Sequence, residues 1–171
     1  MTELATRYFD DVQVGEELPA LAVELTRTVI VATAIASRDY QDVHHDPDLA
    51  NARGSDDIFM NILSTNGFVG RFVTDWGGPA TLIESVSIRL GAPNYPGDTM
   101  TLTGSVTEVS DPDQHDAGHG DGRGDERGDG RADGRGALTI AVRGSNSRGD
   151  HVTGTVRVAL PRRGVSLRVL P

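Results

Sequence analysis

The chain has 171 residues, a formal net charge of −9 and no cysteine. The segment 111–136 alone holds 8 of the 21 glycines and 8 of the 25 acidic residues, which leaves 145 residues for about one domain. Those 145 residues carry 17 acidic residues against 12 arginines, so we expect neither a nucleic-acid-binding surface nor attraction to an anionic membrane. Without cysteine the chain forms no disulfide and no thiolate metal site, and we expect it in a reducing cytoplasm. The longest apolar run, residues 29–35, is too short to span a membrane.

The first half of the chain predicts one short strand followed by helices. Residues 21–25 are typical of a strand, and the apolar spacing over 27–37 predicts a helix with Thr26 as its N-cap. The pair Asp46-Pro47 is a helix start signal for a short helix over 48–53. Residues 58–76 form the most apolar helical segment, which we expect to be buried on most of its circumference.

After Gly77 the apolar period changes from 3.6 residues to 2, which is typical of strands. Four strands are predicted, over 82–90 and around 100–106, 138–142 and 152–158, with a turn at 93–98. A strand, then helices, then antiparallel strands is an α+β order in which one curved sheet buries one long helix. The sequence therefore predicts a single α+β domain over residues 1–161 and a C-terminal extension over 162–171.

The segment 111–136 is an insert between two predicted strands. It contains no aliphatic residue larger than alanine. Burial cannot offset its ordering entropy, so we expect a disordered loop.

The residues with the clearest chemical potential lie between the first two helices. Asp39 follows one helix, and His44 lies just before the cap of the next. This spacing places a carboxylate and an imidazole close enough to share one water molecule, which suits general acid/base chemistry. From the spacing alone, the alternative that these side chains are solvated or cap helices stays open, and we expect Asp46 to be a cap and Asp42 to be solvated.

Three stretches of sequence carry a resemblance to a known family. The stretch from Ser37 to Asp46 (SRDYQDVHHD) resembles the hydratase motif of the MaoC-like, or R-specific enoyl-CoA hydratase, family, with Asp39, His44 and Asp46 in register. It departs from the usual motif at positions 38, 41 and 42, where arginine, glutamine and aspartate replace glycine, asparagine and proline. Residues 88–99 (IRLGAPNYPGDT) and 9–19 (FDDVQVGEELP) are also similar to stretches of this family.

The resemblance implies a hot-dog fold, an antiparallel sheet wrapped around a long central helix. It also implies syn addition of water to a trans-2-enoyl-CoA, with Asp39 and His44 as the catalytic pair and a backbone amide at the start of the central helix, at Asn61, as the oxyanion donor. Which of the two catalytic groups is the base stays open. We expect no cofactor beyond the CoA of the substrate thioester, and no metal site.

Several other residues have competing interpretations. Arg89 lies on a predicted strand and is a candidate contact for an acyl-CoA phosphate, although a solvated position is equally compatible with the pattern. Asp98 is predicted to stabilise a turn, and His151, at the start of a strand, is predicted to be exposed.

Residues 57–76 resemble a narrower branch, the small catalytic subunit of the actinobacterial steroid side-chain enoyl-CoA hydratase. In that branch a catalytic hot-dog subunit pairs with a second MaoC-like subunit that lacks the catalytic pair. We therefore expect an enoyl-CoA hydratase subunit in steroid side-chain degradation that works as a hetero-oligomer. The alternatives are a non-catalytic hot-dog subunit that binds acyl-CoA and a hot-dog thioesterase.

Overall fold

The computed structural model describes residues 5–110 and 134–164. Most of the predicted insert and most of the predicted C-terminal extension lie outside these ranges. The insert prediction extended two residues too far, because strand β4 (Arg135–Asn146) already begins at Arg135. The last strand, β5 (Gly149–Pro161), ends immediately before the predicted extension.

Five strands form one antiparallel sheet in the order β1-β3-β4-β5-β2. The first three by sequence are β1 (Glu17–Glu24), β2 (Leu82–Leu90) and β3 (Thr99–Ser110). The alternating apolar pattern predicted all four later strands, and it predicted the bounds of β2 correctly. Strands β1 and β2 lie at the two edges of the sheet, so each has one side that is not paired within the chain.

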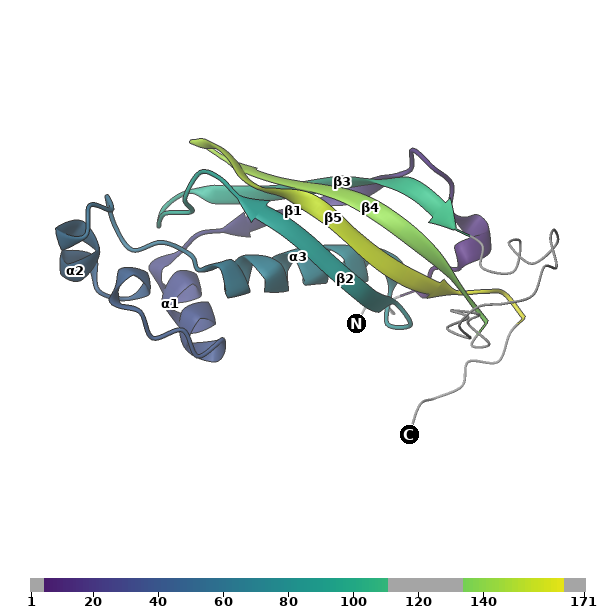
Figure 1. Ribbon diagram of the computed structural model, residues 1–171, viewed down its shortest axis with the longest axis horizontal. Helices are drawn as coiled ribbons and strands as arrows, with labels where there is room; N and C mark the ends of the chain where they lie inside the picture. Colours follow the sequence, from purple (N-terminus) through teal and green to yellow (C-terminus); the bar gives the residue numbers. More distant parts are fainter. Residues whose placement is uncertain (1–4, 111–133, 165–171) are drawn as a thin grey trace, which may run out of the picture.

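The long helix α3 (Ile62–Gly77) lies along one face of the sheet (Figure 1). The sequence predicted its start four residues too early. The Asn61 side chain caps the helix by accepting the N–H of Ser64. The residues before it are not helical, because Phe59 N–H is bonded to Val43 O and Met60 N–H to Asn94 O.

The prediction that α3 is buried on most of its circumference was wrong. Val69, Phe72 and Val73 are buried against the sheet, whereas a second face of the helix is exposed at residues that include Ile62 (47%) and Leu63 (48%). A single sheet covers one side of a helix only. The other side, with two large apolar residues in its first turn, is available to another surface.

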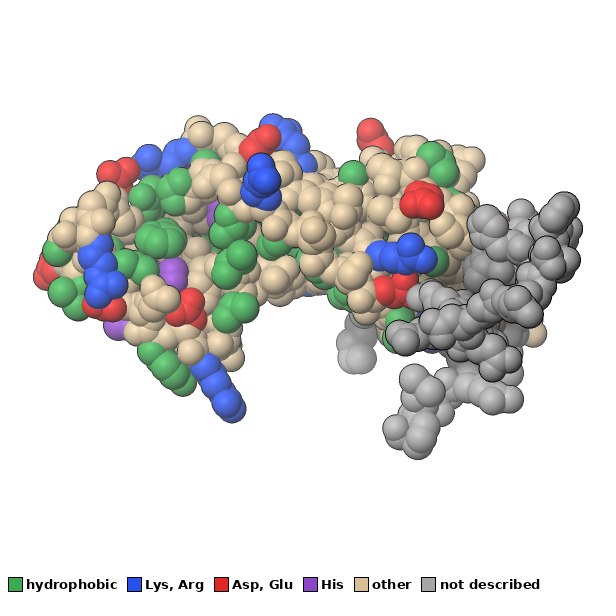
Figure 2. Space-filling view, in the orientation of Figure 1, with side chains coloured by type: hydrophobic (Ala, Val, Ile, Leu, Met, Phe, Trp, Pro, Cys, Tyr) green, Lys and Arg blue, Asp and Glu red, His purple; other side chains and the backbone are tan. Residues whose placement is uncertain are grey.

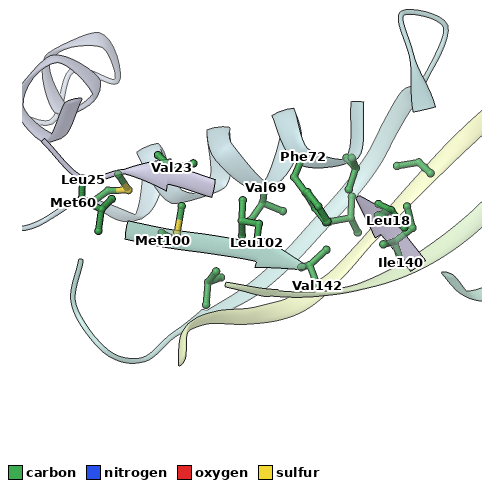
Figure 3. Close-up of a cluster of buried hydrophobic side chains, with 14 of the residues drawn as sticks. Leu18, Val23, Leu25, Met60, Val69, Phe72, Met100, Leu102, Ile140 and Val142 are labelled. Atoms are coloured by element: carbon green, nitrogen blue, oxygen red, sulfur yellow. The ribbon is translucent and has the colours of Figure 1, made fainter. Parts of the chain in front are cut away.

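The core is a continuous apolar layer between α3 and the sheet (Figure 3). Phe72 packs over Gly104 of β3, where an added Cβ atom would lie 3.0 Å from the ring of Phe72 and 2.6 Å from Ala141 O. Glycine at this position therefore allows the aromatic ring to lie directly on the strand.

Helices α1 (Arg27–Ala36) and α2 (Pro47–Ala52) lie together at one end of the molecule (Figure 1). Helix α1 begins at Thr26, whose hydroxyl accepts the N–H of Val29, and helix α2 begins at Asp46, whose carboxylate accepts two backbone N–H groups. Both caps are as predicted. The 3-10 helix η2 (Asp42–His44) lies between them, and a further 3-10 helix, η1 (Phe9–Asp11), precedes β1. No helix within the described ranges is long and apolar enough to cross a membrane.

Candidate active site

Asp39 and His44 face each other, as their spacing predicted. Asp39 follows the end of α1, His44 ends η2, and Asp39 Oδ2 lies 3.3 Å from His44 Nε2. The His44 residue is 5% exposed, whereas the side chain of Asp39 is 18% exposed. The pair is thus mostly withdrawn from solvent but remains accessible from the carboxylate side.

The backbone fixes the tautomer of His44. Its Nδ1 lies 2.7 Å from Phe59 O, and the Phe59 ring packs edge-on against the imidazole at a centroid distance of 5.0 Å. A carbonyl oxygen only accepts hydrogen bonds, so Nδ1 carries the hydrogen and Nε2 of the neutral ring has a lone pair. Nε2 and the ionised carboxylate are then two acceptors turned toward one point. One water molecule there would give one hydrogen to each.

Asp39 is held in its ionised form by its neighbours. The side-chain amide of Asn61 donates to Asp39 Oδ2 at 2.9 Å, and Gln41 N–H donates to Oδ1 at 3.4 Å. The pKa of Asp39 is lowered, chiefly by the Asn61 bond, with smaller contributions from Gln41 and the nearby His44, while partial burial opposes the shift. A carboxylate with a lowered pKa is a weak base at neutral pH.

The start of α3 supplies unpaired backbone donors at the place where an oxyanion donor was predicted. Among the described residues, the N–H groups of Asn61, Ile62 and Leu63 have no hydrogen-bond partner. The first N–H groups of a helix carry partial positive charge and favour a developing negative charge. The backbone of Asn61 therefore fits the predicted oxyanion role, while its side chain is engaged elsewhere.

A cavity of about 350 Å³ brings these groups together. Its walls are formed by residues of the segments 39–44, 59–62 and 90–93 and by His151. Figure 2 shows apolar side chains gathered on the surface at the end of the molecule that carries α1 and α2, with histidine among them. The cavity is lined both by the polar side chains of Asp39 and His44 and by apolar residues, a combination typical of sites for small molecules with an apolar part.

The prediction for His151 was wrong, because this histidine is 2% exposed and lies in the wall of the same cavity. Its Nδ1 is bonded to Ala92 O at 2.7 Å and its Nε2 to Thr65 Oγ1 at 2.9 Å. Burial lowers its pKa. The segment after β2 covers this end of β5, since Gly91 N–H and Ala92 N–H bond to the backbone of His151 and Asp150. Sequence alternation alone gives no signal of such a cover.

The structure separates the remaining candidates. Arg89 is exposed on the edge strand β2, next to Leu90 of the cavity wall, and has no ion pair within the described part of the chain. Asp98 stabilises the turn before β3, as predicted, by accepting the N–H groups of Thr99 and Ser147. Asp42 was predicted to be solvated, but it forms an ion pair with Arg53 at 2.7 Å.

Arg38 has an unusual backbone conformation next to Asp39. Its φ of +59° is the only positive φ of a non-glycine residue in the described ranges. The resembling motif has glycine at this position, which takes up such a conformation without strain. The departure noted in the sequence is therefore a strained residue in the turn that presents Asp39.

The chain is similar to a known hydratase subunit in sequence and to solved hydratase structures in fold. A scan against models of known protein families gives no match. A curated relative, the 3-oxo-4,17-pregnadiene-20-carboxyl-CoA hydratase beta subunit of Mycobacterium tuberculosis, is 46% identical over 147 residues, which cover 86% of this chain and 95% of the relative.

The similar solved structures share the fold. One chain of the ChsH1-ChsH2 complex from Mycobacterium tuberculosis is 44% identical and superposes with a TM-score of 0.71, with coverage of 86% of this chain and 98% of the other. The R-hydratase PhaJ1 from Pseudomonas aeruginosa also has a TM-score of 0.71, over 96% of this chain and 93% of the other, at 18% identity, which shows the shared hot-dog fold alone. Fold, sequence and the facing Asp39 and His44 agree, and the chain belongs to the MaoC-like hydratase family, which includes the 3-oxo-4,17-pregnadiene-20-carboxyl-CoA hydratase beta subunit.

Proposed function

We propose that this chain is the catalytic subunit of an enoyl-CoA hydratase in steroid side-chain degradation, which adds water to the 2,3 double bond of a steroid enoyl-CoA. The observation that carries the proposal is the 3.3 Å approach of Asp39 Oδ2 and His44 Nε2 in the wall of the cavity. The name of the 46% identical relative supports a CoA thioester of a steroid acid as the substrate. The cysteine-free sequence is in keeping with a cytoplasmic location.

The reaction starts from a water molecule that donates one hydrogen bond to His44 Nε2 and one to Asp39 Oδ2. Both lone pairs of its oxygen are then directed away from the pair, toward the substrate. Because the lowered pKa of Asp39 makes its carboxylate a weak base, we assign proton acceptance to His44 Nε2, which takes the proton as the oxygen forms a bond to C3. The adjacent carboxylate stabilises the resulting imidazolium.

The electron pair of the double bond moves toward the thioester as the C3–O bond forms. The negative charge then collects on the thioester oxygen, where the unpaired N–H groups at the start of α3 stabilise it. Return of the proton from His44 Nε2 to C2 completes the addition. Water oxygen and proton arrive from the same side of the substrate, so the addition is syn, and the product is a 3-hydroxyacyl-CoA.

Arg89 is proposed to bind the substrate away from the reacting atoms. It is exposed on the outer face of β2, one residue before Leu90 of the cavity wall, and has no competing ion pair among the described residues. A free guanidinium in that position suits a phosphate group of CoA. Substitution by alanine should raise KM and leave kcat unchanged.

A second hot-dog subunit is proposed to complete the site along β2. This edge strand has unpaired backbone groups on one side and exposed apolar side chains at Leu82 (44%), Ile83 (41%) and Leu90 (36%). Exposed strand edges are normally paired or covered. The strand leads directly into residues 90–93 of the cavity wall, so a subunit added there would also enclose the substrate. The solved complex that contains a 44% identical chain supports a hetero-oligomer.

The partner surface can be tested with one pair of variants. Ile83→Asp should dissociate the complex with a co-expressed MaoC-like subunit and reduce hydration. Val14→Asp, at an apolar residue that is 62% exposed before the opposite edge strand β1, is the matched control and should leave the complex intact. Equal behaviour of the two variants in sizing experiments would contradict a partner at β2.

The activity itself is tested on the co-expressed complex. With a steroid enoyl-CoA, we expect loss of the enoyl thioester absorbance and formation of a 3-hydroxyacyl-CoA, without release of free CoA. Release of CoA would instead indicate a thioesterase. A complex in which hydration survives loss of both Asp39 and His44 would indicate that this chain is the non-catalytic subunit.

A further inference from the structure

We propose that the side chain of Asn61 is a positioning residue, which fixes the catalytic carboxylate of Asp39 relative to the oxyanion donors at the start of α3. This inference rests on the proposed hydration reaction and assigns a second role to a residue whose backbone N–H is the proposed oxyanion donor. The side chain contacts neither water nor substrate in this role. It acts through Asp39.

All the hydrogen-bonding capacity of the Asn61 side chain is used within the protein. Its Nδ2 donates to Asp39 Oδ2 at 2.9 Å and to Ser37 Oγ at 3.0 Å. Its Oδ1 accepts Ser64 N–H at 2.8 Å and the Ser64 hydroxyl. An asparagine side chain has two N–H donors and one oxygen with two lone pairs, so no group remains to bind a substrate. The residue is 2% exposed.

These partners also define the orientation of the amide. An ionised carboxylate only accepts hydrogen bonds, so the nitrogen of Asn61 must face Asp39. The backbone N–H of Ser64 only donates, so the oxygen of Asn61 must face the helix. Rotation of the amide by 180° would place oxygen against oxygen at Asp39 and N–H against N–H at Ser64. The amide is thus locked by its neighbours.

The locked amide joins the two halves of the site. Through its oxygen it is part of the N-cap of α3, where the unpaired N–H groups of Asn61, Ile62 and Leu63 lie. Through its nitrogen it holds Asp39 at a fixed distance from those groups. Nucleophilic water and thioester oxygen must be placed together within a few tenths of an ångström for efficient reaction, and one rigid side chain links the protein groups that place them.

The ionisation of Asp39 provides independent support. The Asn61 bond is the largest of the influences that lower the Asp39 pKa. Loss of that bond should raise the pKa of the carboxyl group. A residue that only stabilised the helix would leave this pKa unchanged.

Two substitutions remove the donor and keep the cap. Asn61→Ser retains a favourable N-cap residue that is too short to reach Asp39, and Asn61→Asp retains cap and shape but replaces the amide nitrogen by a second carboxylate oxygen. Both retain the backbone N–H of position 61. Thr26→Ala is the matched control, because it removes the equivalent side-chain cap of α1 without any described contact with Asp39.

The experiment uses the full complex and two measurements. In both Asn61 variants we expect kcat to fall about 10- to 100-fold, with KM changed less than about threefold. In carboxyl carbon NMR titrations, with the Asp39 signal assigned from Asp39→Asn, we expect its pKa to rise, most strongly in Asn61→Asp because two carboxylates then face each other. Thr26→Ala should lower Tm and change neither measurement.

Unchanged kcat and unchanged Asp39 pKa in both variants would overturn the proposal, as would a rise in KM at constant kcat, which would indicate direct substrate contact. The titration does not depend on turnover. A wild-type complex that fails to hydrate enoyl-CoA would therefore refute the proposed function, while a raised Asp39 pKa in the variants would still establish the Asn61 link.

Discussion

Two walls of the same cavity each hold a buried histidine, and the two rings are anchored alike. His44 Nδ1 is 2.7 Å from Phe59 O, and His151 Nδ1 is 2.7 Å from Ala92 O. The two residues are 5% and 2% exposed. Each carbonyl fixes the same tautomer, with the hydrogen on Nδ1 and a lone pair on Nε2. Burial and the carbonyl contact at Nδ1 therefore do not distinguish the proposed catalytic histidine, His44, from His151.

The difference lies at Nε2. In His151 the lone pair accepts the Thr65 hydroxyl at 2.9 Å, and burial lowers the pKa of the ring. In His44 the lone pair faces the carboxylate of Asp39, another acceptor, at 3.3 Å. The first histidine has its hydrogen-bonding capacity satisfied by the protein. When its ring is neutral, the second has no hydrogen-bond donor for Nε2 among the described residues, and in the proposed mechanism a water molecule supplies that hydrogen.

The largest effect is expected when the carboxylate that faces His44 Nε2 is removed, because His151 Nε2 has no such carboxylate. Asp39→Asn replaces the carboxylate by a neutral amide, so the water loses one acceptor and the imidazolium loses its counter-charge. We expect hydration by the complex to fall at least about 100-fold, the usual contribution of a positioned acid/base group, with the fold retained. Asp42→Asn, which removes a carboxylate of the same loop that pairs with Arg53, is the control and should remain active.

A smaller effect is expected from the opposite wall. Thr65→Val removes the only donor to His151 Nε2 in the described structure and leaves a buried nitrogen unsatisfied. Such a group costs about 1–3 kcal/mol of stability. Denaturant unfolding should show this loss, while kcat should change only a few-fold. A 100-fold loss of kcat at wild-type stability would make His151 a catalytic group and remove the contrast between the walls.

The same wall predicts how stability depends on pH. The pKa of His151 is lowered from 6.5 in the folded state. As pH falls below about 6.5, the unfolded chain therefore binds a proton at this residue while the folded chain does not yet bind one. Stability therefore falls in this range, with its contribution from His151 fully present above pH 6.5. Tm measured across this range should fall less steeply in His151→Gln. Identical slopes would show that His151 does not titrate differently on folding.

The smallest effect concerns backbone strain at Arg38, in the turn before Asp39. Arg38 has a φ of +59°, where a non-glycine residue costs roughly 1 kcal/mol relative to glycine. Arg38→Gly should therefore stabilise the protein by up to about 1 kcal/mol, less the entropy that glycine adds to the unfolded chain. A destabilised variant in denaturant unfolding would show that the Arg38 side chain contributes more than the strain removes.

Local signals explain how much of this molecule was predictable. The caps at Thr26 and Asp46 and the alternation over residues 82–90 depend on neighbouring residues only, and they gave the correct elements. The approach of Asp39 to His44 followed from their spacing and from the resemblance to a known motif.

The features that the sequence did not predict depend on contacts between segments that are far apart in the chain. The predicted start of α3 was too early because the N–H groups of Phe59 and Met60 bond to the backbone of Val43 and Asn94. The burial of His151 arises from the Gly91–Ala92 backbone, and the role of the Asn61 side chain arises from a carboxylate 22 positions away. No periodicity or cap motif contains this information.

The central claim is that His44 and His151 differ in function because their Nε2 atoms have different partners, and one paired measurement tests it directly. His44→Gln and His151→Gln are prepared in the same co-expressed complex, and their hydration rates with a steroid enoyl-CoA are compared at equal fractions folded. We predict a loss of at least about 100-fold for His44→Gln and a change of only a few-fold for His151→Gln. Equal losses, or a larger loss for His151→Gln, would contradict the account.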